Sequence, residues 1–252
     1  MYSKIAEKLR LGLEPAAIFF TDIKPDGALQ FEKGKRGCVA SMLIASAKGK
    51  TVVFDDETYG CSGGGVGLCF GDTFTRDNAP IECRLSTGDD ALAATGKTNA
   101  ASLGRGERFF DSPEVAYKWR VSFPYAQTSK KYVVFKPLSK VNESDPPDLI
   151  HIFINPDQLS ALIVMSGYYR GAGLNAIAPF GAACHSIVYA YHETQKDHPN
   201  GVIGFFDILQ RYMLPKELLS YTVPFSMYLE FENCADESFL TTEAWGKIEG
   251  RL

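Results

Sequence analysis

Cysteines are the residues of this chain best suited to carry chemistry, and three of the six share one local setting. Cys38 and Cys61 each follow a glycine, and Cys184 follows a Gly-Ala-Ala segment. We expect Cys38 and Cys184 to begin helices, where the helix dipole and unpaired N–H groups stabilise a thiolate. A single cysteine among apolar residues is more often a buried hydrophobe. Three in one setting favour a metal centre with Cys38, Cys61 and Cys184 as its ligands.

An iron–sulfur cluster is the cofactor that such a site would suit. Thiolates bind its irons, and backbone amides donate hydrogen bonds to its sulfur atoms. Three cysteines on a four-iron cluster would leave one iron for water, a substrate or a fourth residue, for which His185 and Cys69 are the candidates. That iron could act as a Lewis acid, or the cluster could carry electrons. The pattern does not choose between these roles.

Three consecutive glycines, Gly63, Gly64 and Gly65, follow shortly after Cys61. They do not fit the glycine spacing of a dinucleotide-binding turn, but their N–H groups could still cradle an anion. Because the loop starts so close to Cys61, we expect these glycines to line the cysteine site and to bind the cofactor. The alternative is a plain turn between a strand and the next helix.

The other three cysteines lack this setting. Cys69 and Cys83 stand between larger side chains and are expected to pack as small hydrophobes, while Cys234 is expected at a helix end. No Cys-x-x-Cys pair occurs, so the usual zinc-ribbon, ferredoxin and thioredoxin signatures are absent from the sequence. We expect all three to be dispensable for the cofactor.

Two other classes of function remain open at this point. In a thiol-dependent enzyme, Cys184 would be the nucleophile and a histidine its base. The adjacent His185 points to a different helix face, which makes it a poor base for that cysteine. A non-catalytic protein could instead bind a small ligand through the glycine-rich segment. Whether the chain is an enzyme is left open by the sequence.

Strands and helices alternate along the chain, which predicts an α/β or α+β fold. We expect one compact domain over residues 1–252, with a mixed sheet covered by helices. The apolar run at 148–154 is typical of a central strand covered on both faces. Further strands are expected at 15–20, 51–54, 132–137 and 202–206. Helices are expected at 2–13, 38–47, 113–122, 155–168 and 184–193, with later helix starts at Pro215, Pro224 and Ser238.

Composition limits the partners. The net charge is −4 and the longest basic cluster lies at 33–36, so we expect no nucleic-acid binding. No stretch approaches 18 apolar residues, so no membrane helix is expected. The first residues mix charged with apolar side chains, unlike a secretory signal, and a cytoplasmic location is expected. The partner would be a small-molecule substrate or a redox protein, and the sequence indicates no oligomeric state.

Several segments resemble the uncharacterised "domain of unknown function 169" family of bacteria and archaea, many of them anaerobes. The resemblance implies that the recurring cysteines of the family fall on Cys38, Cys61 and Cys184. This chain departs from it at Ser62, where many relatives carry proline. Because the family has no settled activity, the resemblance implies a set of residues and no reaction. The matching segments include Lys35-Arg-Gly-Cys-Val-Ala40, Tyr59-Gly-Cys-Ser-Gly-Gly-Gly65, Ile152-Phe-Ile-Asn-Pro156 and Thr222-Val-Pro-Phe-Ser-Met227.

Overall fold

A computed structural model describes residues 1–35, 37–70, 75–76, 79–94 and 104–252. Contacts divide the chain into two compact units, one formed by residues 1–70 with 126–252 and the other by residues 71–125. All of the cysteines predicted as ligands belong to the first unit. The expectation of a single domain over residues 1–252 stays a prediction.

A seven-stranded mixed sheet organises the first unit. Neighbouring strands are antiparallel except β7 and β8, which are parallel. This confirms the expected α/β fold with a mixed sheet. The strand order is β2 (Val52–Phe54), β5 (Tyr132–Pro137), β1 (Ala16–Thr21), β6 (Leu149–Ile154), β9 (Leu219–Pro224), β8 (Gly201–Gly204) and β7 (Ala176–Ile177).

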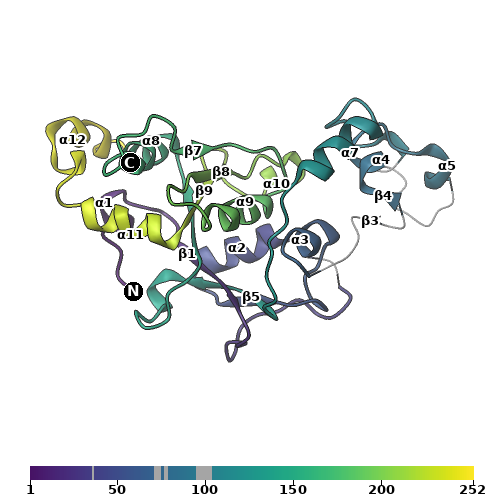
Figure 1. Ribbon diagram of the computed structural model, residues 1–252, viewed down its shortest axis with the longest axis horizontal. Helices are drawn as coiled ribbons and strands as arrows, with labels where there is room; N and C mark the ends of the chain where they lie inside the picture. Colours follow the sequence, from purple (N-terminus) through teal and green to yellow (C-terminus); the bar gives the residue numbers. More distant parts are fainter. Residues whose placement is uncertain (36, 71–74, 77–78, 95–103) are drawn as a thin grey trace. The chain divides into compact units, whose positions relative to one another are not determined.

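One face of this sheet packs against an apolar helix layer, and we call it the core face. Ile150, Ile152 and Ile154 alternate along β6 toward this layer, as successive strand residues point to opposite faces. In Figure 1, α8 and α11 lie on one side of the central strands, while α2 and α9 lie on the other. The layer on the core face consists of α1 (Lys4–Lys8), α8 (Pro156–Ser166), α11 (Phe225–Cys234), η2 (Phe239–Thr241) and α12 (Glu243–Glu249).

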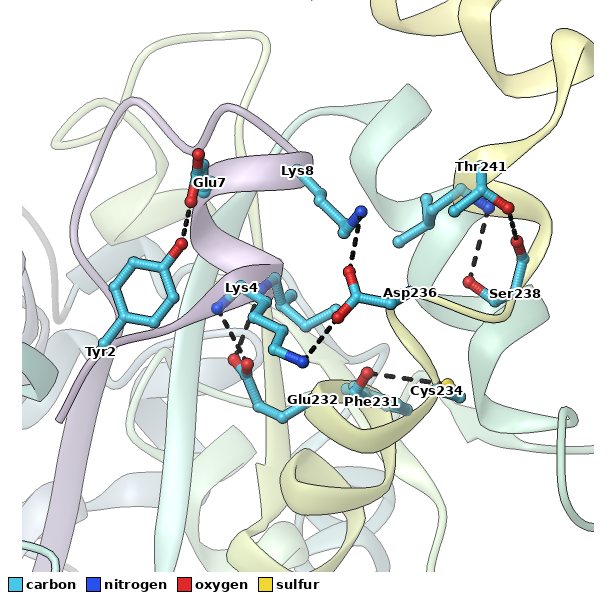
Figure 2. A network of polar contacts seen from close by, with 12 residues as sticks. Tyr2, Lys4, Glu7, Lys8, Phe231, Glu232, Cys234, Asp236, Ser238 and Thr241 are labelled. Carbon is cyan, nitrogen blue, oxygen red and sulfur yellow. Dashed lines mark hydrogen bonds and ion pairs between the residues drawn. The ribbon is translucent and has the colours of Figure 1, made fainter.

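Polar contacts attach α1 to the end of α11 (Figure 2). The backbone N–H of Lys4 donates to Glu232 Oε2 at 2.8 Å. Asp236 accepts from the ammonium groups of Lys4 at 2.6 Å and Lys8 at 3.1 Å. These contacts therefore join α1 to the C-terminal end of α11 within the helix layer that covers the core face.

Helices α2 (Val39–Ala47) and α9 (His185–Glu193) cover the opposite face, which we call the cysteine face. Helix α9 contacts β6, β8 and β9, and α2 contacts β1, β2 and β5. The short α3 (Ser62–Gly67) contacts α9. A Cβ atom placed on Gly204 would lie 2.6 Å from Cβ of Ser186, so the glycine allows α9 to lie directly against β8.

The second unit contains β3 (Thr75–Arg76), β4 (Ala79–Pro80), α4 (Ile81–Leu85), α5 (Asp90–Ala93) and α7 (Pro113–Ser122). Helix α7 begins as its sequence predicts, with Ser112 accepting from the N–H of Val115 and proline in the first turn. Arg120 pairs with Glu82, which attaches α7 to α4. Within the described residues of both units, no helix is long and apolar enough to cross a membrane.

Most of the predicted elements are confirmed, and three expectations are wrong. The first helix ends at Lys8, and Arg10 has a left-handed φ of 47°. Pro215 begins no helix, because the segment that follows it forms β9 between β6 and β8. The expected loop at 60–65 is already helical from Ser62. Pro224 both ends β9 and precedes α11, as expected for that helix.

Candidate functional site

The three predicted ligands occupy equivalent places in the fold. Cys38, Cys61 and Cys184 each stand at the N-cap position, directly before α2, α3 and α9. Cys184 is buried, and the other two are half-buried. Three segments that are far apart in the sequence therefore each present one thiol from a helix start.

The contacts around Gly64 show that the starts of α2, α3 and α9 lie close together. A Cβ atom placed on Gly64 would lie 3.1 Å from Sγ of Cys61 and 3.9 Å from Sγ of Cys184. The two sulfur atoms are thus no farther apart than the sum of these distances, which is inside the roughly 10 Å beyond which we expect no shared site. The same Cβ would lie 2.8 Å from Cγ2 of Val39, the residue after Cys38. The structure therefore brings all three cysteine-bearing segments to Gly64.

Two more glycines hold Cys38 beside Cys61. The N–H of Gly37 donates to the carbonyl oxygen of Gly60 at 3.0 Å. Both glycines pack against the ring of Phe31, because an added Cβ would lie 2.2 Å from that ring at Gly37 and 2.8 Å at Gly60. Gly60 also has a φ of +79°, which favours glycine. The sequence pattern identified the glycines, but not the aromatic ring that requires them.

The predicted cofactor-binding glycines have three different surroundings. The N–H of Gly64 donates to Sγ of Cys61 at 3.2 Å. Gly65 lies against Tyr59, whose ring would be 2.3 Å from an added Cβ. A Cβ on Gly63 would meet no described atom within 4 Å. These residues form the first turns of α3 rather than a loop, and Gly64 is the one that lies among the sulfur atoms.

Electrostatics link the three thiols. Burial, followed by the nearby Cys61, raises the pKa of Cys38 to about 11. Burial raises the pKa of Cys184 well above its ordinary value, and Cys61 and Cys38 raise it further. Each thiolate disfavours the next, since like charges in a site of low dielectric repel. Three thiolates here require a cationic centre between them.

Asp207 joins this group, although the sequence analysis did not select it. Asp207 is 7% exposed, and its charge raises the pKa of both Cys38 and Cys184. It precedes α10 (Ile208–Arg211), where its Oδ1 accepts from the N–H of Leu209 at 2.9 Å. No local sequence signal marks it, because its proximity to the cysteines depends on how β8 packs against α9.

The two residues suggested as a fourth ligand differ from that expectation. His185 Nδ1 accepts from the N–H of Ala182 at 3.1 Å, and burial lowers the pKa of His185 to about 3. Cys69 lies beyond the other end of α3, eight residues after Cys61. It is exposed, with a φ of 71°, beside a surface pocket that Lys130 also lines. The expectation that Cys69 packs as a small hydrophobe is therefore wrong.

The remaining cysteines lie elsewhere. Cys234 is buried on the core face, where its thiol donates to the carbonyl oxygen of Phe231 at 3.6 Å. Cys83 is half-buried in α4 of the second unit. Among the described residues, no three His, Cys, Asp or Glu side chains are close enough together to hold a single metal ion.

Comparison with known proteins gives a family and no activity. No curated protein matches the chain, and no solved structure matches it. A family model described as "DUF169: Uncharacterised ArCR, COG2043" matches residues 4–233, which include all three converging cysteines and Asp207. The match covers most of the 252 residues, so the chain belongs to the DUF169 family.

Proposed function

We propose that this protein binds one iron–sulfur cluster through Cys38, Cys61 and Cys184. The observation that carries the proposal is that three helix starts, each bearing one cysteine, meet around Gly64, with the sulfur atoms of Cys61 and Cys184 near its added Cβ. A cysteine that serves only to fill the core has no need of other cysteines nearby, as Cys234 on the core face shows. The cluster would supply the positive charge that allows three neighbouring thiols to bind as thiolates.

Spacing favours a cluster over a single ion. A tetrahedral ion with metal–sulfur bonds near 2.3 Å draws its sulfur ligands to within about 3.8 Å of one another. No described group of three side chains is arranged to hold one ion. Thiolates on different irons of a cluster stand farther apart than thiolates on one ion. The N–H of Gly64, which donates to Sγ of Cys61, is a contact of the kind that tunes such a cluster.

The environment of Cys184 argues against the nucleophile alternative. A nucleophilic cysteine must be a thiolate in reach of its substrate, but Cys184 is buried and its pKa is raised. His185 is a weak base, because burial lowers its pKa to about 3. A binding module built on the glycine segment is likewise disfavoured, since that segment is helical.

The cluster would serve in electron transfer or as a Lewis acid for a small-molecule substrate. We place the protein in the cytoplasm, since a reducing compartment keeps the thiols available for metal. The chain's own residues hold the site together through the Phe31 clamp on Gly37 and Gly60. Cys184 is buried at the start of α9, which limits its access to water.

The test is metal and sulfide analysis of protein purified without oxygen and, in a parallel sample, reconstituted with ferrous iron and sulfide. The wild-type chain is expected to bind up to about four irons with matching sulfide and to show visible absorption. Cys38→Ala, Cys61→Ala and Cys184→Ala should each lose most of the iron. Cys83→Ala and Cys234→Ala are the matched controls and should keep it. Folded wild-type protein that takes up no iron and sulfide, or only zinc, would overturn the proposal.

A further inference from the structure

The sulfur atoms of Cys61 and Cys184 both lie next to Gly64, although the two cysteines are far apart in the sequence. An added Cβ on Gly64 would lie 3.1 Å from the first sulfur and 3.9 Å from the second, so the two sulfur atoms are no farther apart than the sum of these distances. The other of its three nearest contacts is the side chain of Val39. Cys61 and Cys184 are therefore two thiols for which the structure sets an upper limit on the separation.

A disulfide would require these sulfur atoms to approach to about 2.05 Å. Because Gly64 has no side chain, no Cβ atom occupies the space beside the two sulfurs. Helix α3, which begins directly after Cys61, has six residues, and four of them are glycines. Glycine loses more conformational freedom on folding than any other residue, and so short a helix is marginal on its own. Cys61 therefore stands at the end of an element that can shift toward Cys184.

The two thiols differ in exposure, which sets the order in which they react. Cys61 is half-buried and Cys184 is buried, so a small disulfide from solution reaches Cys61 first. The Cys61 thiolate attacks one sulfur of that disulfide, forms a mixed disulfide and releases one small thiolate, which takes up the proton that Cys61 has lost. Cys184 then attacks the sulfur of Cys61, and its proton passes to the second small thiolate as that group leaves. The two protein thiols are oxidised, and the small disulfide is reduced to two thiols.

We propose that Cys61 and Cys184 form a reversible disulfide when the cluster is absent, and that this bond prevents the cluster from binding until it is reduced. The inference rests on the proposed function, because it assigns a second, oxidised state to two of the three proposed ligands. The thiolate is the form of cysteine that binds metal, so the bond would leave Cys38 as the one remaining ligand. Disulfides of cytosolic proteins are usually transient and redox-sensing, which fits such a switch.

The test uses metal-free protein, prepared with a chelator without oxygen and then treated with oxidised glutathione. Cys69→Ala is the parent protein, because the exposed Cys69 thiol would react with glutathione independently. The parent and its Cys184→Ala and Cys38→Ala variants are checked for folding by circular dichroism, alkylated and mapped by mass spectrometry of proteolytic peptides. In the parent and in the Cys38→Ala control, Cys61 should be linked to Cys184. In the Cys184→Ala variant, Cys61 should instead keep bound glutathione, because the second thiol is missing.

Iron uptake provides a second readout. From ferrous iron and sulfide, the oxidised parent should bind less than about a tenth of the iron that the reduced parent binds, and dithiothreitol should restore the difference. Glutathione retained on Cys61 of the parent, a bond from Cys61 to Cys38, or alkylation of both Cys61 and Cys184 would overturn the disulfide. Unchanged iron uptake after the bond has formed would overturn its effect on the cluster. A reduced parent that takes up no iron and sulfide would overturn the proposed function, while the peptide map would still decide the disulfide.

Discussion

The two faces of the sheet differ in the side chains that cover them. The core face buries isoleucine, tyrosine and phenylalanine side chains, and its one cysteine, Cys234, is packed among them. The cysteine face carries three converging thiols and buried histidines. Within the described residues, it also carries polar atoms that have no hydrogen-bond partner, namely His151 Nε2, Ser220 Oγ and Ser46 Oγ. Buried polar groups of this kind cost stability. The comparison teaches that one face is filled by apolar packing, whereas the other gathers thiols and buried polar groups that packing alone does not require.

Truncation on the core face should have the largest effect on stability and none on the cofactor. Phe231→Ala removes a fully buried ring from α11, and we expect a loss of about 3–5 kcal/mol in the free energy of unfolding. Denaturant unfolding measures the loss, and iron analysis of the folded fraction measures the cofactor. If folded Phe231→Ala protein lacked iron while wild type held it, the separation between the two faces would be wrong.

Gly60→Ala tests the clamp that joins Cys38 to Cys61. The new Cβ would sit at a φ of +79° and 2.9 Å from the backbone nitrogen of Gly37. We expect a loss of about 1–3 kcal/mol and reduced iron binding. Gly27→Ala is the matched control, because Gly27 has a similar φ of +66° but an added Cβ there meets no described atom. Equal stability and equal iron content in the two variants would show that the clamp does not shape the site.

Acid should destabilise the protein partly through the cysteine face. Burial lowers the pKa of His151 to about 3, below the ordinary value of 6.5. Between these values the unfolded chain binds a proton that the folded chain does not, so His151 lowers the free energy of unfolding as pH falls through this window. The slope from one histidine is at most about 1.4 kcal/mol per pH unit. His151→Gln should flatten the measured slope, and an unchanged slope would show that His151 is protonated in the fold.

The smallest effect on stability is expected at Gly63, which is compared here with its neighbour Gly64. Gly63→Ala places a methyl group where no described atom is near and replaces a helical glycine, so stability should change by less than about 1 kcal/mol, with full iron content. Gly64→Ala places the methyl group 3.1 Å from Sγ of Cys61 and should reduce iron binding. Iron content after identical reconstitution distinguishes the variants. If both retained full iron, the cofactor would not approach Gly64.

Local sequence patterns were sufficient for most of the elements and for placing Cys38 and Cys184 at helix starts. The apolar run in β6 predicted a central strand, and the residues around Cys38 and Cys184 predicted helix starts. Long-range contacts were beyond those patterns. Phe31 lies far along the chain from Gly60, and the approach of Asp207 to the site depends on contact between β8 and α9. Pro215 predicts a helix start because proline is common in the first turn of helices, whereas the pairing of β9 with β6 and β8 is decided by tertiary structure.

The central claim is that Cys38, Cys61 and Cys184 hold one cluster, and X-ray absorption at the iron edge tests it most directly. Anaerobically prepared wild-type and Cys234→Ala proteins should both show a sulfur shell near about 2.3 Å, by analogy with zinc thiolates, together with scattering from neighbouring irons. Folded Cys184→Ala should lose most of both signals. Iron surrounded only by nitrogen and oxygen in the wild-type protein, without iron–iron scattering, would contradict the account.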